Sequence, residues 1–512
     1  MSAEHYDVVV VGSGFGGSVT ALRLTEKGYR VAVLEAGDRF EDADFAANNW
    51  DLKRYLFAPA AACYGIMRID LIKDCLIVAG AGVGGGSLVY ANTLYEPLDP
   101  FYSDPAWSGI TDWKSELAPY YDQAKRMLGV TTCPVTTPAD DLMREVAEEM
   151  GVGHTVHPTP VGVLFGGPGD RPGDEVADPF FGGVGPSRNV CHNCGECMTG
   201  CRHNAKNTLV KNYLHLAERA GAVVHPLTTV TRVRPQSDDG PGRYVVEARW
   251  TKAKLSRRSA VKTFTADHVV FSAAALGTQK LLHRLKATGD LPGISDRLGE
   301  LTRTNSESIL GALAPDTEVD YSQGVAITSS WHPDERTHIE PVRFGHGSNA
   351  IAFLQTVLVA GGPGVRRRWA AELIRKLPHL TDYYDVKHWS ERAVIALVMQ
   401  AVDNSITVSA RRTPIGWRLT SKQGHGDPNP TWLPVGHEAV KRMAARMSRD
   451  GRPGQAESAS ASPSADRPPR TSSAAARSVT LRPRAWSIPT SGSTATTGCT
   501  WSTGQRSPPT SA

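Results

Sequence analysis

The sequence predicts an α/β protein with two sheets, a parallel one near the N-terminus and a mainly antiparallel one in the second half. Three observations predict this fold class. An unbroken, mostly β-branched run, Tyr6 to Val11, is typical of a buried parallel strand and ends at Gly12. Short apolar or alternating runs between residues 310 and 432 are typical of antiparallel strands. After Met447 the composition changes to one that does not support a folded core.

Length, charge and hydropathy exclude several classes of protein. A chain of 512 residues can form two or three domains. The net charge of +4 arises in residues 451–512, which hold seven Arg, no Lys and two acidic residues, so nothing in the remainder points to nucleic acid. The N-terminus has no basic leader or apolar h-region, and runs such as Ala393 to Val402 are too short to span a bilayer. We therefore expect a cytoplasmic protein without a signal peptide or transmembrane segment.

The first strand is followed by a glycine motif that binds dinucleotides. Gly12, Gly14 and Gly17 form G-x-G-x-x-G. The first glycine permits the tight turn, the second lets the backbone approach a pyrophosphate, and the third lets helix and strand pack closely. The pyrophosphate would lie on the N-terminus of the following helix.

The rest of the fingerprint continues at fixed offsets. Gly28 ends the predicted helix, Val31 to Leu34 form the second strand, and Glu35 follows, where it can accept both hydroxyls of an adenosine ribose. The alternative is a glycine-rich turn in an ordinary α/β sheet. Because strand, helix, strand and acid are all in place, we interpret the region as a Rossmann-like domain that binds a nucleotide.

A second glycine cluster favours FAD over NAD. Gly80 to Ser87 (GAGVGGGS) follows the apolar strand Leu76 to Ala79 and can lie against a flat ring system. A third element, the strand His268 to Ser272, is followed by small residues where it returns to the nucleotide. Close packing of strand and helix would explain this third element equally well.

Four segments together, VGSGFGGSVTALRL, GAGVGGGSLVYANTLY, FSAAALGTQKLL and RTNSES, resemble the glucose-methanol-choline (GMC) flavin oxidoreductases, and among them the actinobacterial cholesterol oxidase group. The resemblance covers roughly residues 5–447. It implies an FAD-binding domain over residues 1–309, which the family closes with a C-terminal segment, and a substrate-binding domain over residues 310–447. Within the second domain we expect strands at Val325 to Ser330, Val394 to Met399 and Ser405 to Ser409, and an apolar pocket wall at Ala350 to Ala360.

The resemblance also implies FAD contacts residue by residue. Phe15 and Gly16 would contact the pyrophosphate, and Glu35 would bind the ribose. Gly86, Tyr90 and Asn92 would lie along the flavin, and the backbone of Val230 would contact adenine. Tyr90 stands where secreted cholesterol oxidases have an Asn, so this chain departs from the family pattern there.

In the family, a His takes the proton of an alcohol while hydride passes to the flavin, and O2 then reoxidises the flavin to give peroxide. The resemblance therefore implies oxidation of a sterol or other hydrophobic alcohol in steroid and lipid metabolism, with peripheral membrane contact to extract the substrate. Glu340, in HIEPVRF, best matches the Glu that shifts the steroid double bond in some members. The alternative for Glu340 is a surface carboxylate beside a strand.

Four cysteines have the spacing C-x2-C-x2-C-x3-C, namely Cys191, Cys194, Cys197 and Cys201. This spacing is that of bacterial ferredoxins, which predicts a metal site such as a 4Fe–4S cluster. Arg202 replaces the usual Pro, and the other cysteines form no second run. Zinc, with His192 or His203 as a further ligand, and a loop of reduced thiols are the alternatives.

The segment after Met447 cannot form a core. Residues 451–512 hold one Val, one Leu and one Ile among many Ser, Ala, Thr, Pro and Arg, so residues 448–512 are predicted to be a disordered tail. In the family this region supplies the catalytic His, the Asn after it and the segment that closes over the flavin. The chain lacks a matching His and Asn.

A shifted reading frame would restore that segment. In the shifted frame, each new codon starts at the third base of a codon in the present frame. Codons for Thr471 to Thr480 (TSSAAARSVT) can then encode His-Phe-Leu-Gly-Gly-Cys-Ala-Ile-Gly-Asp, which resembles the catalytic His block of the family. Trp501 to Ala512 permits Val-Val-Asp-Gly-Ala-Ala-Ile-Ser-Ala-Asn-Leu-Gly, which resembles the flavin-closing strand. We infer a frameshift, in the gene or its sequencing, that begins between Met447 and Ser460.

Three functions follow from these interpretations. The first is an FAD-dependent sterol oxidase. The second is an FAD dehydrogenase of another alcohol that passes electrons to an iron–sulfur cluster or another acceptor. The third is an inactive remnant, because a chain without the catalytic His and the flavin lid would retain FAD weakly and turn over negligibly.

Overall fold

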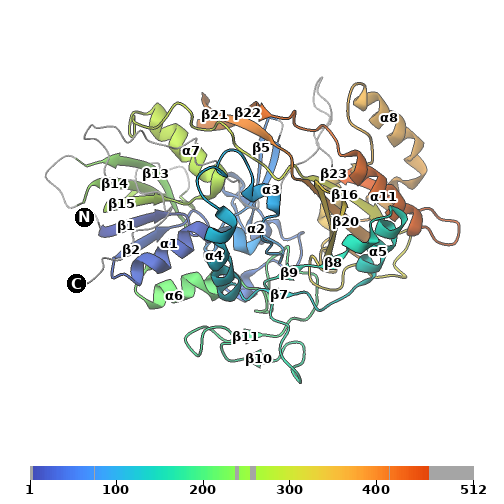
Figure 1. Ribbon diagram of the computed structural model, residues 1–512, viewed down its shortest axis with the longest axis horizontal. Helices are drawn as coiled ribbons and strands as arrows, with labels where there is room; N and C mark the ends of the chain where they lie inside the picture. The colour runs from blue at the N-terminus through green and yellow to red at the C-terminus, as the bar shows by residue number, and fades with distance from the viewer. Residues whose placement is uncertain (1–3, 74, 237–241, 254–260, 414–415, 460–512) are drawn as a thin grey trace.

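The computed structural model describes residues 4–73, 75–236, 242–253, 261–413 and 416–459, and its N-terminal half is built on a six-stranded sheet (Figure 1). The strands lie in the order β12, β2, β1, β15, β14 and β13. Their bounds, in the same order, are Val223–His225, Val31–Leu34, Glu4–Val11, Val261–Phe271, Tyr244–Trp250 and Thr228–Pro235. β1 pairs in parallel with β2 and β15, whereas β13, β14 and β15 pair antiparallel.

Helices cover both faces of this sheet, which explains why Val8 to Val11 of β1 and all of β2 are apolar and buried. α1 (Phe15–Thr25) and α6 (Tyr213–Arg219) pack together on one face, and α7 (Ala274–Ala287) covers the other (Figure 1). The first two predicted strands are confirmed as β1 and β2, and the predicted helix between them is α1. Along the described chain no helix combines the length and the apolar character needed to cross a membrane.

The second sheet has seven strands in the order β19, β23, β16, β20, β18, β17 and β8, and every neighbouring pair is antiparallel. Their bounds, in the same order, are Gln355–Val357, Gln455–Ala459, Ser308–Leu313, Ala393–Gln400, Thr337–Val342, Ser329–Asp334 and His157–Pro158. The mainly antiparallel second sheet that the sequence predicts is therefore present. β8 belongs to residues 1–309, which the predicted boundaries assign to the FAD-binding domain. The second sheet therefore includes one strand from outside the predicted substrate-binding domain.

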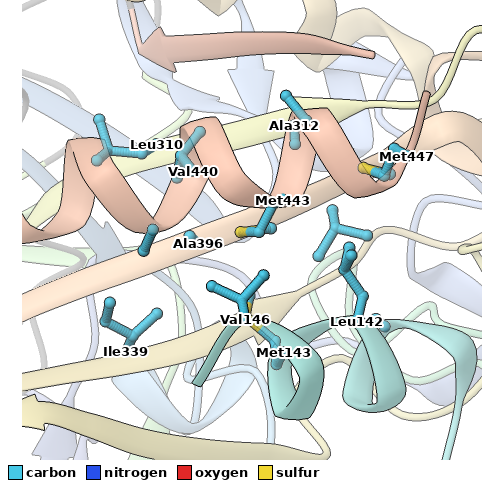
Figure 2. Close-up of a cluster of buried hydrophobic side chains, with 14 of the residues drawn as sticks. Leu142, Met143, Val146, Leu310, Ala312, Ile339, Ala396, Val440, Met443 and Met447 are labelled. Atoms are coloured by element: carbon cyan, nitrogen blue, oxygen red, sulfur yellow. The ribbon is translucent and has the colours of Figure 1, made fainter. Parts of the chain in front are cut away.

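Two helices cover the outer face of the second sheet. α5 (Pro138–Glu149) and α11 (Pro434–Arg446) lie on it side by side, as Figure 2 shows. Met443 of α11 and Val146 of α5 are fully buried against strand residues such as Ala396. The opposite face of the sheet is turned toward the first sheet and the loops between them (Figure 1).

Of the three strands predicted in the substrate domain, two form strands over their full length and one does so only in part. Val394 to Met399 lies within β20, but of Val325 to Ser330 only the last two residues enter a strand, because Val325 to Ile327 instead pack against the loop that carries the cysteines. Ser405 to Ser409 lies in β21 (Asn404–Thr413), which pairs with β22 (Gly416–Gly426) as a separate hairpin outside the seven-stranded sheet.

The predicted apolar pocket wall is only partly buried. Residues 349–354 form a 3-10 helix in which Phe353 and Leu354 are exposed, and only the following β19 is buried throughout. An apolar composition alone does not decide burial in a short helix whose outer side faces solvent.

The start of the predicted tail is ordered. Gln455–Ala459 form β23, which lies between β16 and β19. Backbone hydrogen bonds to two neighbours hold this strand, and they require little of its side chains. The predicted boundary at Met447 therefore falls before the last strand of the sheet, and residues 460–512 lie outside the described residues.

Candidate active site and FAD cradle

The first turn of the chain needs glycine at two positions. Gly12 has φ +100°, and a Cβ there would lie 2.5 Å from the carbonyl oxygen of Ser272. A Cβ on Gly17 would lie 2.0 Å from the carbonyl oxygen of Gly12. The turn, the helix that follows it and the end of β15 are thus packed as closely as the glycine motif predicts.

The N-terminus of α1 is open to a ligand. Gly14 is its N-cap, and no side chain caps the helix. A Cβ on Gly14 would have no neighbour nearer than 3.9 Å, and Gly16 follows in the first turn. Free backbone N–H groups at a helix N-terminus bind phosphate, so this end of α1 fits the pyrophosphate of FAD.

Glu35 is buried at the end of β2 and held by backbone and hydroxyl donors. Its Oε2 accepts hydrogen bonds from the backbone N–H of Ser13, at 3.0 Å, and from Ser13 Oγ, at 2.7 Å. Its Oε1 accepts one from the backbone N–H of Gly37, at 2.9 Å. These bonds fix the carboxylate while leaving lone pairs for ribose hydroxyls. The sequence prediction missed Ser13, although it lies inside the glycine motif.

The two glycine loops meet. Gly85 has φ +50°, and a Cβ on it would lie 2.7 Å from Cα of Gly14. A Cβ on Gly86 would lie 3.7 Å from the ring of Phe15, and that ring stands edge-on to Tyr90, with 6.1 Å between the ring centroids. Four of the residues predicted to contact FAD are therefore gathered where the second loop covers the first.

The other two predicted FAD contacts have structural partners of their own. The amide of Asn92 is buried and pairs in both directions with the backbone of Ile327, at 2.8 and 3.0 Å. These bonds join the flavin loop, as we call Gly80 to Asn92 after its predicted contacts, to the segment that leads into β17. Val230 lies at an irregularity in β13, two residues after Thr228, whose backbone N–H donates to the carbonyl of Glu35 at 2.6 Å. Val230 therefore lies near the ribose end of the cradle.

Glu340 is not a surface carboxylate. It lies in β18, is fully buried, and pairs with Leu397 of β20. Opposed residues of an antiparallel pair share a face, and Leu397 belongs to the face that α5 and α11 leave uncovered. Its Oε1 is 3.7 Å from Nε2 of His338. The carboxylate is thus on the face of the second sheet that α5 and α11 leave uncovered and that is turned toward the first sheet.

Known proteins match the chain along most of its length. A model of FAD-dependent oxidoreductases matches residues 7–50, and a model of GMC oxidoreductases matches residues 184–294. The chain is 56% identical over 452 residues to a cholesterol oxidase of Mycobacterium tuberculosis, which covers 86% of this chain and 77% of that protein. It is 42% identical over 446 residues to a cholesterol oxidase of Acinetobacter baumannii, covering 86% and 79%.

The chain belongs to the GMC oxidoreductase family, in its cholesterol oxidase group. It is therefore an FAD-dependent oxidoreductase, as the sequence predicts. Pyridoxine 4-oxidase from Mesorbium loti has a similar fold, with a TM-score of 0.50, 17% identity, and coverage of 87% of this chain and 81% of that one. The segment predicted to encode the GMC catalytic His and Asn in a shifted frame lies outside the described residues.

The cysteine run of this GMC oxidoreductase forms a compact loop. All four are free thiols, and Cys191 and Cys197 are buried. Burial raises the pKa of Cys194 to about 12 and that of Cys197 to about 11, so without a bound cation these thiols stay protonated. Of the other described cysteines, Cys63 and Cys75 lie in other parts of the fold, whereas Cys133 packs in the same hydrophobic cluster as Cys191 and Cys197.

A buried lysine joins this loop to the flavin loop. Nζ of Lys206 donates to the carbonyl oxygens of Leu88 and Cys197, at 2.8 Å each, and lies 5.1 Å from the centroid of the Tyr90 ring. The sequence prediction missed this contact, because nothing in the pattern around Lys206 shows that it reaches a loop 118 residues earlier in the chain.

Proposed function

We propose that this protein oxidises the 3β-hydroxyl group of a sterol to the ketone, with FAD as cofactor and O2 as the electron acceptor. The observation that carries the proposal is the identity of 56% and 42%, over most of the chain, to two cholesterol oxidases. The FAD cradle at Gly14 and Glu35 supports it, since the open helix end and the fixed carboxylate fit the pyrophosphate and the ribose.

FAD, when bound, would supply the redox chemistry, with O2 as the final electron acceptor. The proton of the hydroxyl group would pass to the catalytic His that the shifted reading frame would encode. The chain's own residues would bind and orient the cofactor through the N-terminus of α1, Glu35 and the loop at Gly86. Hydrogen bonds from Ser13 and Gly37 hold the carboxylate of Glu35 in place before the ribose arrives. This fixed geometry reduces the entropy cost of binding.

Glu340 would move a proton within the ketone product. We infer that its carboxylate takes a proton from the carbon between the ketone and the double bond and returns it to the far carbon of that bond. Its burial and its place on the face turned toward the first sheet support this role. A buried carboxylate beside an apolar sterol is a stronger base than one in water.

Sterol as the substrate implies contact with a membrane, since sterols reside there. We propose that the contact is peripheral.

The test is an absorption spectrum of the purified protein followed by a peroxide assay. A flavin spectrum and peroxide release on adding a 3β-hydroxysteroid, but not its 3α epimer, would support the proposal. Flavin without peroxide or oxygen consumption, together with reduction of an artificial acceptor, would support instead a dehydrogenase of another alcohol. Absence of flavin and degradation to fragments by limited proteolysis would identify an inactive remnant.

A further inference from the structure

The four cysteines of the run C-x2-C-x2-C-x3-C surround one cavity. The cavity is partly open to solvent and is lined by all four together with His192, His203 and Lys206. Side chains spaced over eleven residues meet because the chain turns sharply between them. Asn193 and Gly195 have φ of +54° and +72°, and a Cβ on Gly195 would lie 2.2 Å from the carbonyl oxygen of Ser322.

Backbone N–H groups lie near three of the four sulfur atoms. The N–H of Asn193 donates to Sγ of Cys191 at 3.4 Å. Those of Glu196 and Ala326 lie close enough to Cys194 and Cys197 to favour the thiolate forms. A neutral thiol is a weak acceptor that gains little from such donors, whereas a thiolate gains much more. N–H···S bonds of this kind also surround the sulfur ligands of iron–sulfur clusters.

Two buried cationic side chains lie near the cysteine loop, and among the described residues neither forms an ion pair with a carboxylate. Lys206 and Arg188 are each 1% exposed. Lys206 donates to backbone carbonyls, and Arg188 donates to the carbonyls of Asn204 and Lys206 and to asparagine side chains. A buried cation is costly unless a negative charge compensates it. Lys206 interacts electrostatically with Cys197 and Cys201, and Arg188 interacts with Cys201 and with Asp42, so anionic sulfur in the cavity would supply the charge that Lys206 lacks and part of that for Arg188.

The spread of the sulfur atoms favours a cluster over a single ion. Zinc bound by four thiolates at about 2.3 Å would bring the sulfurs within roughly 4 Å of one another. Within the described part of this loop, the ligand atoms of Cys194, Glu196 and His203 lie within 4.8 Å of one another. The four cysteine sulfur atoms do not all lie that close together. A cluster core separates its thiolates more widely than one ion does.

We propose that Cys191, Cys194, Cys197 and Cys201 bind a [4Fe–4S] cluster beside the flavin loop. Nζ of Lys206 donates hydrogen bonds both to the backbone of Cys197 and to that of Leu88 in the flavin loop. Lys206 therefore connects the proposed cluster directly to that loop. Binding of a cluster at this site requires neither a sterol substrate nor O2 as the electron acceptor. The cluster can therefore be tested independently of the peroxide assay.

The test is metal analysis of the full chain purified without oxygen. We expect about four iron atoms and an equal amount of acid-labile sulfide per chain, with a paramagnetic resonance signal after reduction by dithionite. Iron and sulfide both absent from protein that retains FAD would overturn the proposal. So would one zinc ion per chain that is lost in His203→Gln, because that result would assign the cavity to a single ion.

Two variants test which sulfurs are ligands. Cys194→Ser, at a partly exposed position, should lose most of the iron while retaining FAD and its melting temperature within a few degrees. Cys63→Ser, at a thiol outside the cavity, is the matched control and should keep both iron and FAD. Equal iron content in the two variants would overturn the assignment.

Discussion

Nε2 of His338 lies 3.7 Å from Oε1 of the fully buried Glu340, two residues further along the same strand. The ring of His338 stacks on His332 at 5.0 Å, and that of His332 stacks on His157 at 5.9 Å. His157 is exposed. A row of imidazoles thus extends from the buried carboxylate to the surface, at the edge of the sheet where β8 and β17 pair.

Glu340→Gln should greatly slow isomerisation. Supplied directly with a 3-keto steroid whose double bond is not conjugated, the variant should form the conjugated ketone roughly 10²- to 10⁴-fold more slowly, because an amide cannot carry the proton. The assay follows the absorbance of the conjugated product and bypasses the oxidation step. Glu335→Gln, at an exposed position in the turn before the same strand, is the control. A rate unchanged by Glu340→Gln would remove Glu340 from the mechanism.

Gly14→Ala should weaken FAD binding without unfolding the protein. The added methyl group has no neighbour nearer than 3.9 Å in the protein, but it occupies the space over the N-terminus of α1 where the pyrophosphate must approach. We expect at least a tenfold rise in the Kd for FAD, measured by fluorescence titration of the apoprotein. Gly293→Ala, where a Cβ meets nothing within 4 Å, should leave binding unchanged. Equal affinity in both variants would place the pyrophosphate elsewhere.

His437 should make the protein less stable in acid. Burial in α11 lowers its pKa from 6.5 to about 4. As the pH falls below 6.5, the unfolded chain binds a proton that the folded chain refuses, so the free energy of unfolding should fall by up to roughly 3 kcal/mol on reaching pH 4. Urea titrations at several pH values should show a shallower acid loss in His437→Gln. Parallel curves for the two proteins would contradict this.

Glu457 should make the protein less stable as the pH rises, which is the opposite of the effect of His437. It is fully buried in β23, close to Gly311 of β16, and burial raises its pKa from 4.5 to about 8. As the pH rises from 4.5 to 8, the unfolded chain releases a proton that the folded chain keeps, so stability should fall by up to roughly 4 kcal/mol. Glu457→Gln should therefore raise the melting temperature more at pH 8 than at pH 5. A stabilisation equal at both pH values would show that the carboxyl is not titrating there.

The parts of the site that the sequence predicts are those defined by short offsets. Gly12, Gly17 and Glu35 can be recognised because a strand, a turn and a helix fix their separations, and the structure brings them together. The contacts of Lys206 and the burial of Glu340 depend on which distant segments meet, and no local pattern encodes that. Likewise β23 could not be predicted from a Ser- and Ala-rich composition, since its neighbours supply what holds it.

A protein made from the restored reading frame should bind FAD more tightly and turn over faster than the 512-residue chain. The shifted frame that begins between Met447 and Ser460 would supply the His block and the closing strand that the GMC family uses. A single-base correction before residue 460 should raise the FAD retained after gel filtration and the rate of peroxide release by at least 10²-fold, because a general base at the alcohol contributes about that much.

Mass spectrometry of the C-terminal peptides made by the source organism gives the direct comparison. Peptides containing the His-Phe-Leu-Gly-Gly-Cys block would show that the shifted frame is the one translated. Peptides with the sequence TSSAAARSVT of Thr471 to Thr480, in a protein that is yellow and oxidises a 3β-hydroxysteroid, would refute the frameshift and require a different general base. The corrected and uncorrected genes encode the same residues up to Met447, so any difference between their activities is assigned to the segment that follows.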